Sequence, residues 1–100
     1  MVNHAVGLGF SQAYYDVLQG YFQQYLPDKT IWAYGSRVTG TAHARSDLDC
    51  VVFGALSGDV FALQEALTES LLPFEVQLHR WEDLPTEFHE AILQCYRVLQ

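Results

Sequence analysis

Basic residues are scarce in this sequence. Its 100 residues include 5 lysines and arginines against 12 aspartates and glutamates, which gives a net charge of −7. A protein that mainly binds a nucleic-acid backbone needs clustered lysines and arginines, and here they are scattered. We therefore do not expect a nucleic acid as the main partner. An anionic nucleotide would depend on bound cations and local N–H donors rather than on the field of the whole protein.

Cysteines and long apolar runs are also scarce. The two cysteines, Cys50 and Cys95, lie in apolar surroundings, so we expect small buried side chains in a reducing cytosol. Their spacing to histidines does not suggest a zinc site. No apolar run approaches membrane length, and the N-terminus lacks the basic and apolar regions of a signal peptide. These absences predict a cytoplasmic protein without a membrane partner.

The composition is that of a globular protein, since half of the residues are apolar and 14% are aromatic. One hundred residues are enough for one hydrophobic core, and no repeat, low-complexity tract or linker interrupts them. The sequence predicts a single domain over residues 1–100. Residues 1–10, which include Gly7 and Gly9 and have no clear hydrophobic period, are expected to form a loose lead-in.

Two apolar runs predict neighbouring strands, residues 30–34 and 48–53. The first run stops at a Gly35-Ser36 corner. We expect a substrate loop from there to residue 44, with a short helix after Ser36. Such a corner offers backbone N–H groups and a hydroxyl that can surround an anion.

The second strand opens with two aspartates, Asp47 and Asp49. Because side chains alternate along a strand, both carboxylates should project from the same face. Mg²⁺ prefers oxygen ligands of this kind and often binds substrate phosphates as well. The sequence therefore suggests a magnesium site beside the Gly-Ser corner.

The remaining segments complete an α/β (α+β) fold, a small mixed sheet of three or four strands with helices packed on one face. A helix should begin after Ser11 and end before Pro27, and a second should follow Gly58 and stop by Pro73. The expected apolar faces of these helices are Tyr14, Leu18, Tyr21, Phe22 and Tyr25, and Val60, Leu63, Leu67 and Leu71.

The C-terminal part should add a third strand at residues 74–79 and a last helix, capped by Asp83 with Pro85 in its first turn. The expected core face of that helix is Phe88, Ile92, Cys95 and Leu99.

Gly35-Ser36, ten intervening residues and Asp47-x-Asp49 resemble the signature of the nucleotidyltransferase superfamily that includes DNA polymerase beta. The fuller strings Gly-Ser-Arg-Val-Thr-Gly and Arg-Ser-Asp-Leu-Asp resemble the minimal nucleotidyltransferases (MNT), small prokaryotic proteins often paired with HEPN-domain toxins. The order of elements over about three quarters of the chain fits this family as well.

The resemblance implies a nucleotidyltransferase-like fold and a set of site residues. Gly35 and Ser36 would hold the triphosphate of ATP or another nucleoside triphosphate, and Gly40 would let the loop approach closely. Asp47 and Asp49 would coordinate one or two Mg²⁺ ions and serve as catalytic residues. For Arg37 three roles are open, namely contact with a nucleotide phosphate, contact with a partner, and a surface ion pair.

The third strand departs from the family pattern. There the MNT proteins carry a third catalytic carboxylate, and an ungapped reading places Gln77 in its position. A glutamine amide can ligate a metal weakly but cannot accept a proton near neutral pH. Glu75 and His79 share the face of Gln77, and only Glu75, by way of a bulge or a long reach, is a candidate substitute. The alternatives are an exposed Glu75 and a hydrogen-bonded His79.

Two functions follow from this resemblance. The first is an enzyme that transfers a nucleoside monophosphate, in particular AMP, to a hydroxyl, such as a tyrosine of a HEPN partner. The second is a nucleotide-binding antitoxin module with impaired transfer. A third interpretation, an interaction domain without a ligand, requires the motif spacing to be accidental. Oligomer formation is compatible with each of them.

Overall fold

The structure is a computed structural model that describes residues 7–100. Its elements are α1 (Gln12–Tyr25), β1 (Thr30–Tyr34), α2 (Ser36–Thr39), β2 (Leu48–Phe53), α3 (Ser57–Thr68), β3 (Val76–Arg80), the short 3₁₀ helix η1 (Trp81–Asp83), α4 (Thr86–Gln94) and β4 (Arg97–Val98).

The four strands form one mixed sheet in the order β3-β2-β1-β4. β1 is antiparallel to both of its neighbours, whereas β2 and β3 are parallel and are connected by α3. A parallel pair needs such a crossover because its two strands start at the same end of the sheet. The predicted fold class and the bounds of the first two strands are confirmed.

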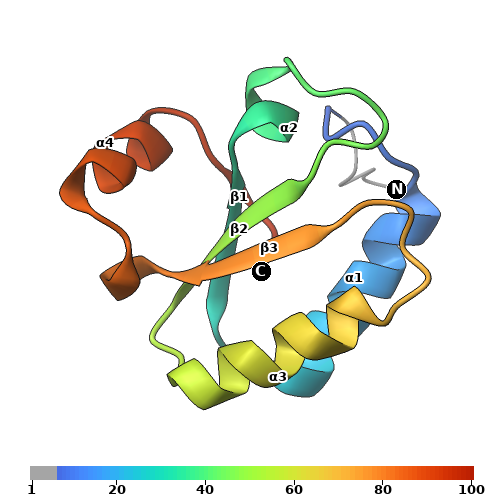
Figure 1. Ribbon diagram of the computed structural model, residues 1–100, viewed down its shortest axis with the longest axis horizontal. Helices are drawn as coiled ribbons and strands as arrows, with labels where there is room; N and C mark the ends of the chain where they lie inside the picture. Colours follow the sequence, from blue (N-terminus) through green and yellow to red (C-terminus); the bar gives the residue numbers. More distant parts are fainter. Residues whose placement is uncertain (1–6) are drawn as a thin grey trace.

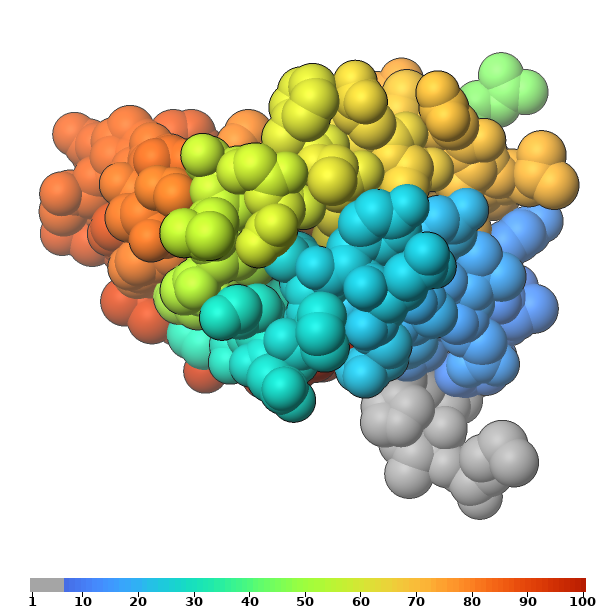
Figure 2. All heavy atoms as spheres, turned by 90° about the horizontal axis from the view of Figure 1, so that it is seen from below, coloured from blue at the N-terminus to red at the C-terminus, as the bar shows by residue number. Residues whose placement is uncertain are grey.

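Helices α1 and α3 lie side by side and cover one face of the sheet (Figures 1 and 2). The strands present alternate residues to these helices, as a period of two requires. The core side chains that the strands contribute are Ile31, Ala33, Leu48, Cys50, Val52, Val76 and Leu78. The carboxylates at positions 47 and 49 therefore belong to the opposite face.

α1 begins as predicted, since the Ser11 hydroxyl accepts a hydrogen bond from the Tyr14 backbone N–H at 3.4 Å. Most of its expected apolar face is confirmed, since Leu18 and Phe22 are buried and Tyr21 and Tyr25 pack against the core. Tyr14 is 39% exposed, and the buried residue at the start of the helix is Tyr15 instead.

α3 is shorter than predicted. It ends at Thr68, and Leu71, which we expected on its apolar face, is 98% exposed. The chain must leave the helix early because residues 69–75 turn back to the start of β3. The expected helix stop at Pro73 is wrong by several residues.

The last helix differs most from expectation. Ile92 is buried, but Phe88 is 49% exposed and Cys95 is exposed. Leu99 is buried from the segment after β4, not from the helix. Pro85 is the N-cap residue, and Asp83 forms an ion pair with Arg80 instead of capping. Among the cysteines, the predicted burial is confirmed for Cys50 and wrong for Cys95.

η1 and α4 lie on the side of the sheet opposite α1 and α3 (Figure 1). They bring aromatic rings onto one end of that face. The ring of Trp32 on β1 lies 3.9 Å from the ring of Tyr96, and the ring of Phe53 on β2 lies 4.9 Å from that of Trp81. The other end of the same face carries the carboxylates.

The segment before α1 is anchored over its described part. Leu8 is 1% exposed and Phe10 packs against the core, although we expected residues 1–10 to be loose. The same expectation covered residues 1–6, which lie outside the described residues. Over residues 7–100, no helix has the length and apolar character to cross a membrane.

Candidate active site

Asp47 and Asp49 lie where β2 begins. Asp49 pairs with Tyr34 of β1 on one side and with Gln77 of β3 on the other. Its neighbours in the strand, Leu48 and Cys50, are fully buried in the core, so the Asp49 carboxylate points to the opposite face. Asp47 precedes it by two residues and is exposed.

The electrostatics of this pair agree with a cation site. Partial burial raises the pKa of Asp49, the nearby Asp47 carboxylate raises it further, and His79 lowers it. Two carboxylates that repel one another in this way are stabilised when a cation lies between them. Burial, followed by the charge of Asp49, also raises the pKa of Tyr34 to about 12, so this phenol stays neutral.

Gly35 of the Gly-Ser corner lies close to Asp49. Gly35 has φ +81°, and a Cβ atom built there would lie 2.6 Å from Oδ2 of Asp49. A side chain at position 35 would therefore both strain the backbone and displace the carboxylate. The two motif halves thus form one site. Sequence reasoning assigned Gly35 to phosphate binding and missed this close approach, for which the glycine itself was the only signal.

α2 follows this corner, as expected for a short helix after Ser36. It ends at Gly40, which has φ +87° and whose backbone N–H donates to the Ser36 carbonyl at 3.0 Å. No neighbouring atom lies within 4 Å of a Cβ built at Gly40. This glycine supports the left-handed turn, and the open space around it agrees with the close approach of the loop that we expected.

Arg37 has a place that none of the sequence expectations foresaw. Its side chain is 1% exposed, so the expected surface ion pair is wrong. Its guanidinium donates to three backbone carbonyls, those of Leu8 at 2.8 Å, Ala44 at 2.9 Å and Ser46 at 2.9 Å. Its donors are thus turned towards the protein interior instead of a nucleotide.

Two aromatic rings complete the surroundings of Arg37. The guanidinium carbon lies 4.7 Å from the ring centroid of Phe74 and 5.4 Å from that of Phe10, and the two rings stack on one another. One buried cation thus connects the segment before α1, the loop before Asp47 and the segment before β3. Its partners are backbone carbonyls, which every residue has, so no sequence pattern could have identified them.

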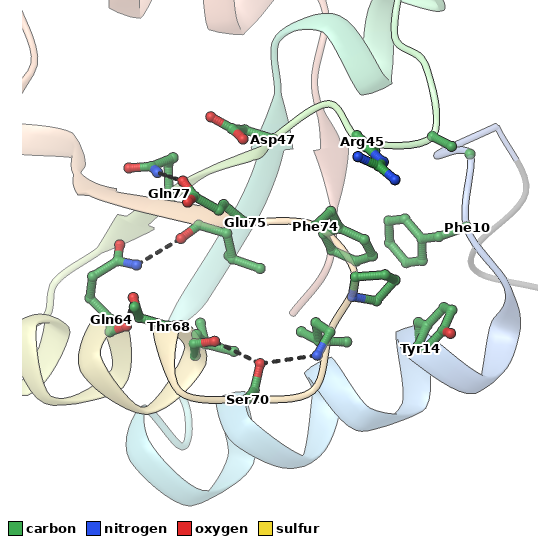
Figure 3. Close-up of a pocket in the computed structure, with 16 residues that line it drawn as sticks. Phe10, Tyr14, Arg45, Asp47, Gln64, Thr68, Ser70, Phe74, Glu75 and Gln77 are labelled. Atoms are coloured by element: carbon green, nitrogen blue, oxygen red, sulfur yellow. Dashed lines mark hydrogen bonds between the residues drawn. The ribbon is translucent and has the colours of Figure 1, made fainter.

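Gln77 occupies the position beside Asp49 that the sequence assigned to it. β2 and β3 pair from Leu48 to Val52 without a break, so no bulge moves Glu75 into that position. The Glu75 side chain nevertheless reaches Gln77, whose amide donates to the Glu75 carboxylate at 3.0 Å, and both residues lie near Asp47 (Figure 3). Within residues 7–100, no group of three histidines, cysteines or carboxylates is arranged to hold a metal.

A mixed sheet whose Gly-Ser corner touches an Asp-x-Asp strand is the arrangement typical of a nucleotidyltransferase. Residues 17–100 match the family model described as polymerase beta, nucleotidyltransferase, and the chain belongs to this family.

Known relatives agree with this assignment. The chain is 40% identical over 87 residues to the probable protein adenylyltransferase MntA of Haemophilus influenzae, covering 84% of this chain and 76% of the relative. A toxin–antitoxin crystal structure with AMP-PNP has a TM-score of 0.70 at 22% identity, with 86% of this chain and 72% of that one covered.

A second solved structure, an MNT antitoxin in complex with a tri-AMPylated HEPN toxin of Shewanella oneidensis, has a TM-score of 0.65 at 18% identity. The match covers 89% of this chain and 71% of the chain in that structure. At these identities, the solved structures establish the fold.

Proposed function

We propose that this protein binds a magnesium-bound nucleoside triphosphate, with ATP as the first candidate, and transfers AMP to a hydroxyl of a HEPN-type partner protein. It would act as an MNT-type antitoxin whose transfer is weakened by Gln77. The observation that carries the proposal is the contact between Gly35 and Asp49. It joins the anion-binding corner and the carboxylates into one site on the open face of the sheet.

The residues fall into two groups in this proposal. Gly35 and Ser36 would contact the triphosphate, and Asp47 and Asp49 would hold Mg²⁺. The fit to Mg²⁺ rests on two hard oxygen donors that share a face and repel one another. When bound, the ion would neutralise phosphate charge and polarise the transferred group.

Arg37 acts indirectly in this scheme. It holds the Ser46 carbonyl next to Asp47, so we propose that it positions the loop without contacting the nucleotide. Gly40 ends α2, and we propose that the open space around it lets the loop approach the nucleotide closely.

Gln77 limits the reaction because its amide cannot accept the proton of the acceptor hydroxyl. Glu75 could accept a proton, but its carboxylate is hydrogen-bonded to Gln77 and it is exposed before the start of β3. We therefore expect nucleotide binding to be retained better than transfer.

The partner proposal rests on the relatives. MntA of Haemophilus influenzae is named a probable protein adenylyltransferase, and the similar solved structures include MNT antitoxins bound to HEPN toxins. By this similarity we propose a HEPN partner for a single-domain, cytoplasmic protein.

Calorimetry with ATP and Mg²⁺ tests the binding site. The natural protein should bind ATP only when Mg²⁺ is present, and Asp47→Asn and Asp49→Asn should each abolish binding. Asp59→Asn is the matched control, since Asp59 is an exposed carboxylate in the first turn of α3. Unchanged binding in both site variants, or no binding in the natural protein, would contradict the proposal.

A second candidate function is a nucleotide-binding antitoxin module without transfer. The favouring observation is the neutral Gln77 in register with Asp49. The mass of a co-purified HEPN partner, measured after incubation with ATP and Mg²⁺, separates the two functions. A mass increase by one AMP supports transfer, and Gln77→Asp should then raise its rate while Gln77→Asn does not. If the partner stays unmodified with the natural protein and with both Gln77 variants, the result supports the nucleotide-binding module without transfer.

A further inference from the structure

The two aspartates of the site are held in different ways. Asp49 belongs to β2 and is fixed by its pairing with Tyr34 on one side and Gln77 on the other. Asp47 lies one residue before β2, at the end of the loop that follows α2, and the strand pairing starts only after it. The position of Asp47 therefore depends on what holds this loop.

The loop is held from the inside by Arg37. Its guanidinium donates to the Ser46 carbonyl through Nε and to the Ala44 carbonyl through Nη2, both at 2.9 Å. Burial lowers the pKa of Arg37, and the charge of Asp47 opposes this effect. Because a guanidinium is a rigid fork, any shift of it moves both carbonyls and, with them, the residue that follows Ser46.

On the side of β3, the surroundings of Asp47 are fixed independently of the loop. The Gln64 side chain on α3 donates to the Val76 carbonyl at 2.7 Å and accepts from the Leu78 N–H at 2.9 Å. These bonds close the outer edge of β3, although an open groove of about 1020 Å³ lies beside it (Figure 3). The loop is thus the part of the site whose position depends on Arg37.

Arg37 is in turn held by the segment before α1. Its Nη1 donates to the Leu8 carbonyl at 2.8 Å, and Leu8 is 1% exposed. The ring of Phe10 stacks on that of Phe74 with 4.7 Å between the centroids, and both rings lie beside the guanidinium. Residues 7–10 thus reach the cation that holds the loop, although they are distant from Asp47 in the sequence.

Gly9 fits against the guanidinium itself. It has φ +83°, and a Cβ atom built there would lie 3.0 Å from Nη1 of Arg37. Gly7 provides a comparison within the same segment, since it has φ +84° and a Cβ atom there would lie 2.9 Å from Nη1 of Arg97 on β4. The two glycines share the left-handed backbone that favours glycine and approach two different arginines equally closely.

We propose that Leu8 and Gly9 are positioning residues of the site: they fix the guanidinium of Arg37 and, through it, the loop that places the Asp47 carboxylate. The inference rests on the proposed function in so far as Asp47 serves a magnesium-bound nucleotide. It adds the segment before α1 to the parts of the chain on which nucleotide binding depends.

The two glycines provide a matched test. Gly9→Ala places a methyl group against Arg37, whereas Gly7→Ala brings the same backbone strain and the same methyl group against Arg97. In calorimetry under conditions where both variants are folded, only Gly9→Ala should weaken the binding of ATP and Mg²⁺. The expected loss is about tenfold, the effect of one lost hydrogen bond to a charged group. Natural affinity in both variants, or equal weakening in both, would overturn the proposal.

A second measurement needs no nucleotide. The Asp47 N–H belongs to the peptide group whose carbonyl Arg37 holds, so its amide chemical shift reports on that hydrogen bond. In the isotope-labelled full chain without ATP, Gly9→Ala should shift the Asp47 amide and Gly7→Ala should not. A natural protein that binds no ATP would remove the proposed function, and the Asp47 amide would still decide the positioning role. ATP binding with an Asp47 amide that Gly9→Ala leaves in place would keep the proposed function and overturn this inference.

A milder variant covers the case in which Gly9→Ala does not fold. Leu8→Val loosens the buried side chain behind the carbonyl that Arg37 holds, so it should shift the Asp47 amide in the same direction as Gly9→Ala. Leu63→Val, which changes a fully buried leucine on α3, is the control for a general loss of core packing and should leave that amide in place. Equal shifts in Leu8→Val and Leu63→Val, or none in either, would contradict a specific link from Leu8 to Asp47.

Discussion

The two ends of one sheet face serve different purposes in this protein. At one end, Trp32 and Phe53 pack against rings from η1 and the segment after α4. At the other end, a short distance along the same two strands, Tyr34 and Asp49 form a cross-strand pair. The side chains of both ends follow the same alternation, so the strand period alone does not distinguish them.

The difference lies in what covers each end. η1 and the segment after α4 cover the aromatic end in part, so that Trp32, Phe53 and Trp81 are half-buried in a cluster of stacked rings, while Tyr96 is 41% exposed. Over the carboxylate end the polypeptide provides a glycine corner and a loop, and Asp47 remains exposed. Charged groups are costly to bury without a partner, so an open end is where carboxylates can remain ionised. The comparison predicts that substitutions at the aromatic end change stability alone, whereas nucleotide binding depends on the carboxylate end.

The largest loss of stability should come from replacing Arg37, whose buried side chain supports the loop before Asp47 at the carboxylate end. Arg37→Met leaves three carbonyls without their donor and removes the stacking on Phe74, and we expect a loss of about 4 kcal/mol in the free energy of unfolding. Chemical denaturation measures this loss. Arg45→Met, which changes an exposed arginine, should alter stability by less than about 0.5 kcal/mol. Equal effects of the two variants would refute the supporting role of Arg37.

The second-largest loss of stability should come from a substitution at the aromatic end. Trp32→Ala removes ring contacts with Phe53, Trp81 and Tyr96 and should cost about 3 kcal/mol. The folded variant should still bind ATP and Mg²⁺ with the natural affinity. Phe88→Ala is the control, since that ring is 49% exposed. A large loss of nucleotide affinity in folded Trp32→Ala would show that the two ends are not independent.

Gly35→Ala affects the contact between the corner and the aspartates. The left-handed backbone at Gly35 and the approach of Asp49 Oδ2 predict a cost of about 2 kcal/mol, together with a loss of Mg²⁺-dependent ATP binding. Denaturation and calorimetry on the same variant measure both effects. Gly58→Ala, at a glycine with open space around it, should change neither quantity appreciably. Natural ATP affinity in Gly35→Ala would contradict the close approach.

The smallest expected effect has the opposite sign. The folded state raises the pKa of Asp49, so ionised Asp49 destabilises the fold once the pH exceeds the raised value. Asp49→Asn should therefore be slightly more stable than the natural protein at neutral pH, by about 0.5 kcal/mol, while binding is lost. The gain should disappear below the ordinary aspartate pKa of 3.8, where the carboxyl is protonated in both states. A stability loss at neutral pH would overturn this account of Asp49.

Much of the site was predictable because local patterns specify it. The strand period placed Asp47 and Asp49 on one face, and the ungapped reading of residues 72–77 put Gln77 at the position that pairs with Asp49. The apolar faces of the helices were predicted less well. Tyr14, Leu71 and Cys95 all fit helical spacing and are all exposed, because apolar spacing does not show where a helix ends or which way it rotates.

Arg37 shows the limit of such patterns. Its position after the Gly-Ser corner suggested a ligand for phosphate, and its neighbours in sequence gave no reason to expect a buried guanidinium. Leu8 and Phe74, which surround it, are distant in the sequence and contribute a carbonyl and a ring. Backbone carbonyls carry no sequence signal, so the role of Arg37 required the folded chain.

The sequence by itself determined the two motif halves, which carry the resemblance to the family, and the first two strands, because strand alternation and glycine corners are local properties of the chain. Only the tertiary structure decided that Gly35 touches Asp49, that Arg37 lies inside the protein, and that Gln64 closes the edge of β3 beside an open groove. These features depend on distances between segments far apart in the chain. Such distances are fixed by packing all of the elements around one core.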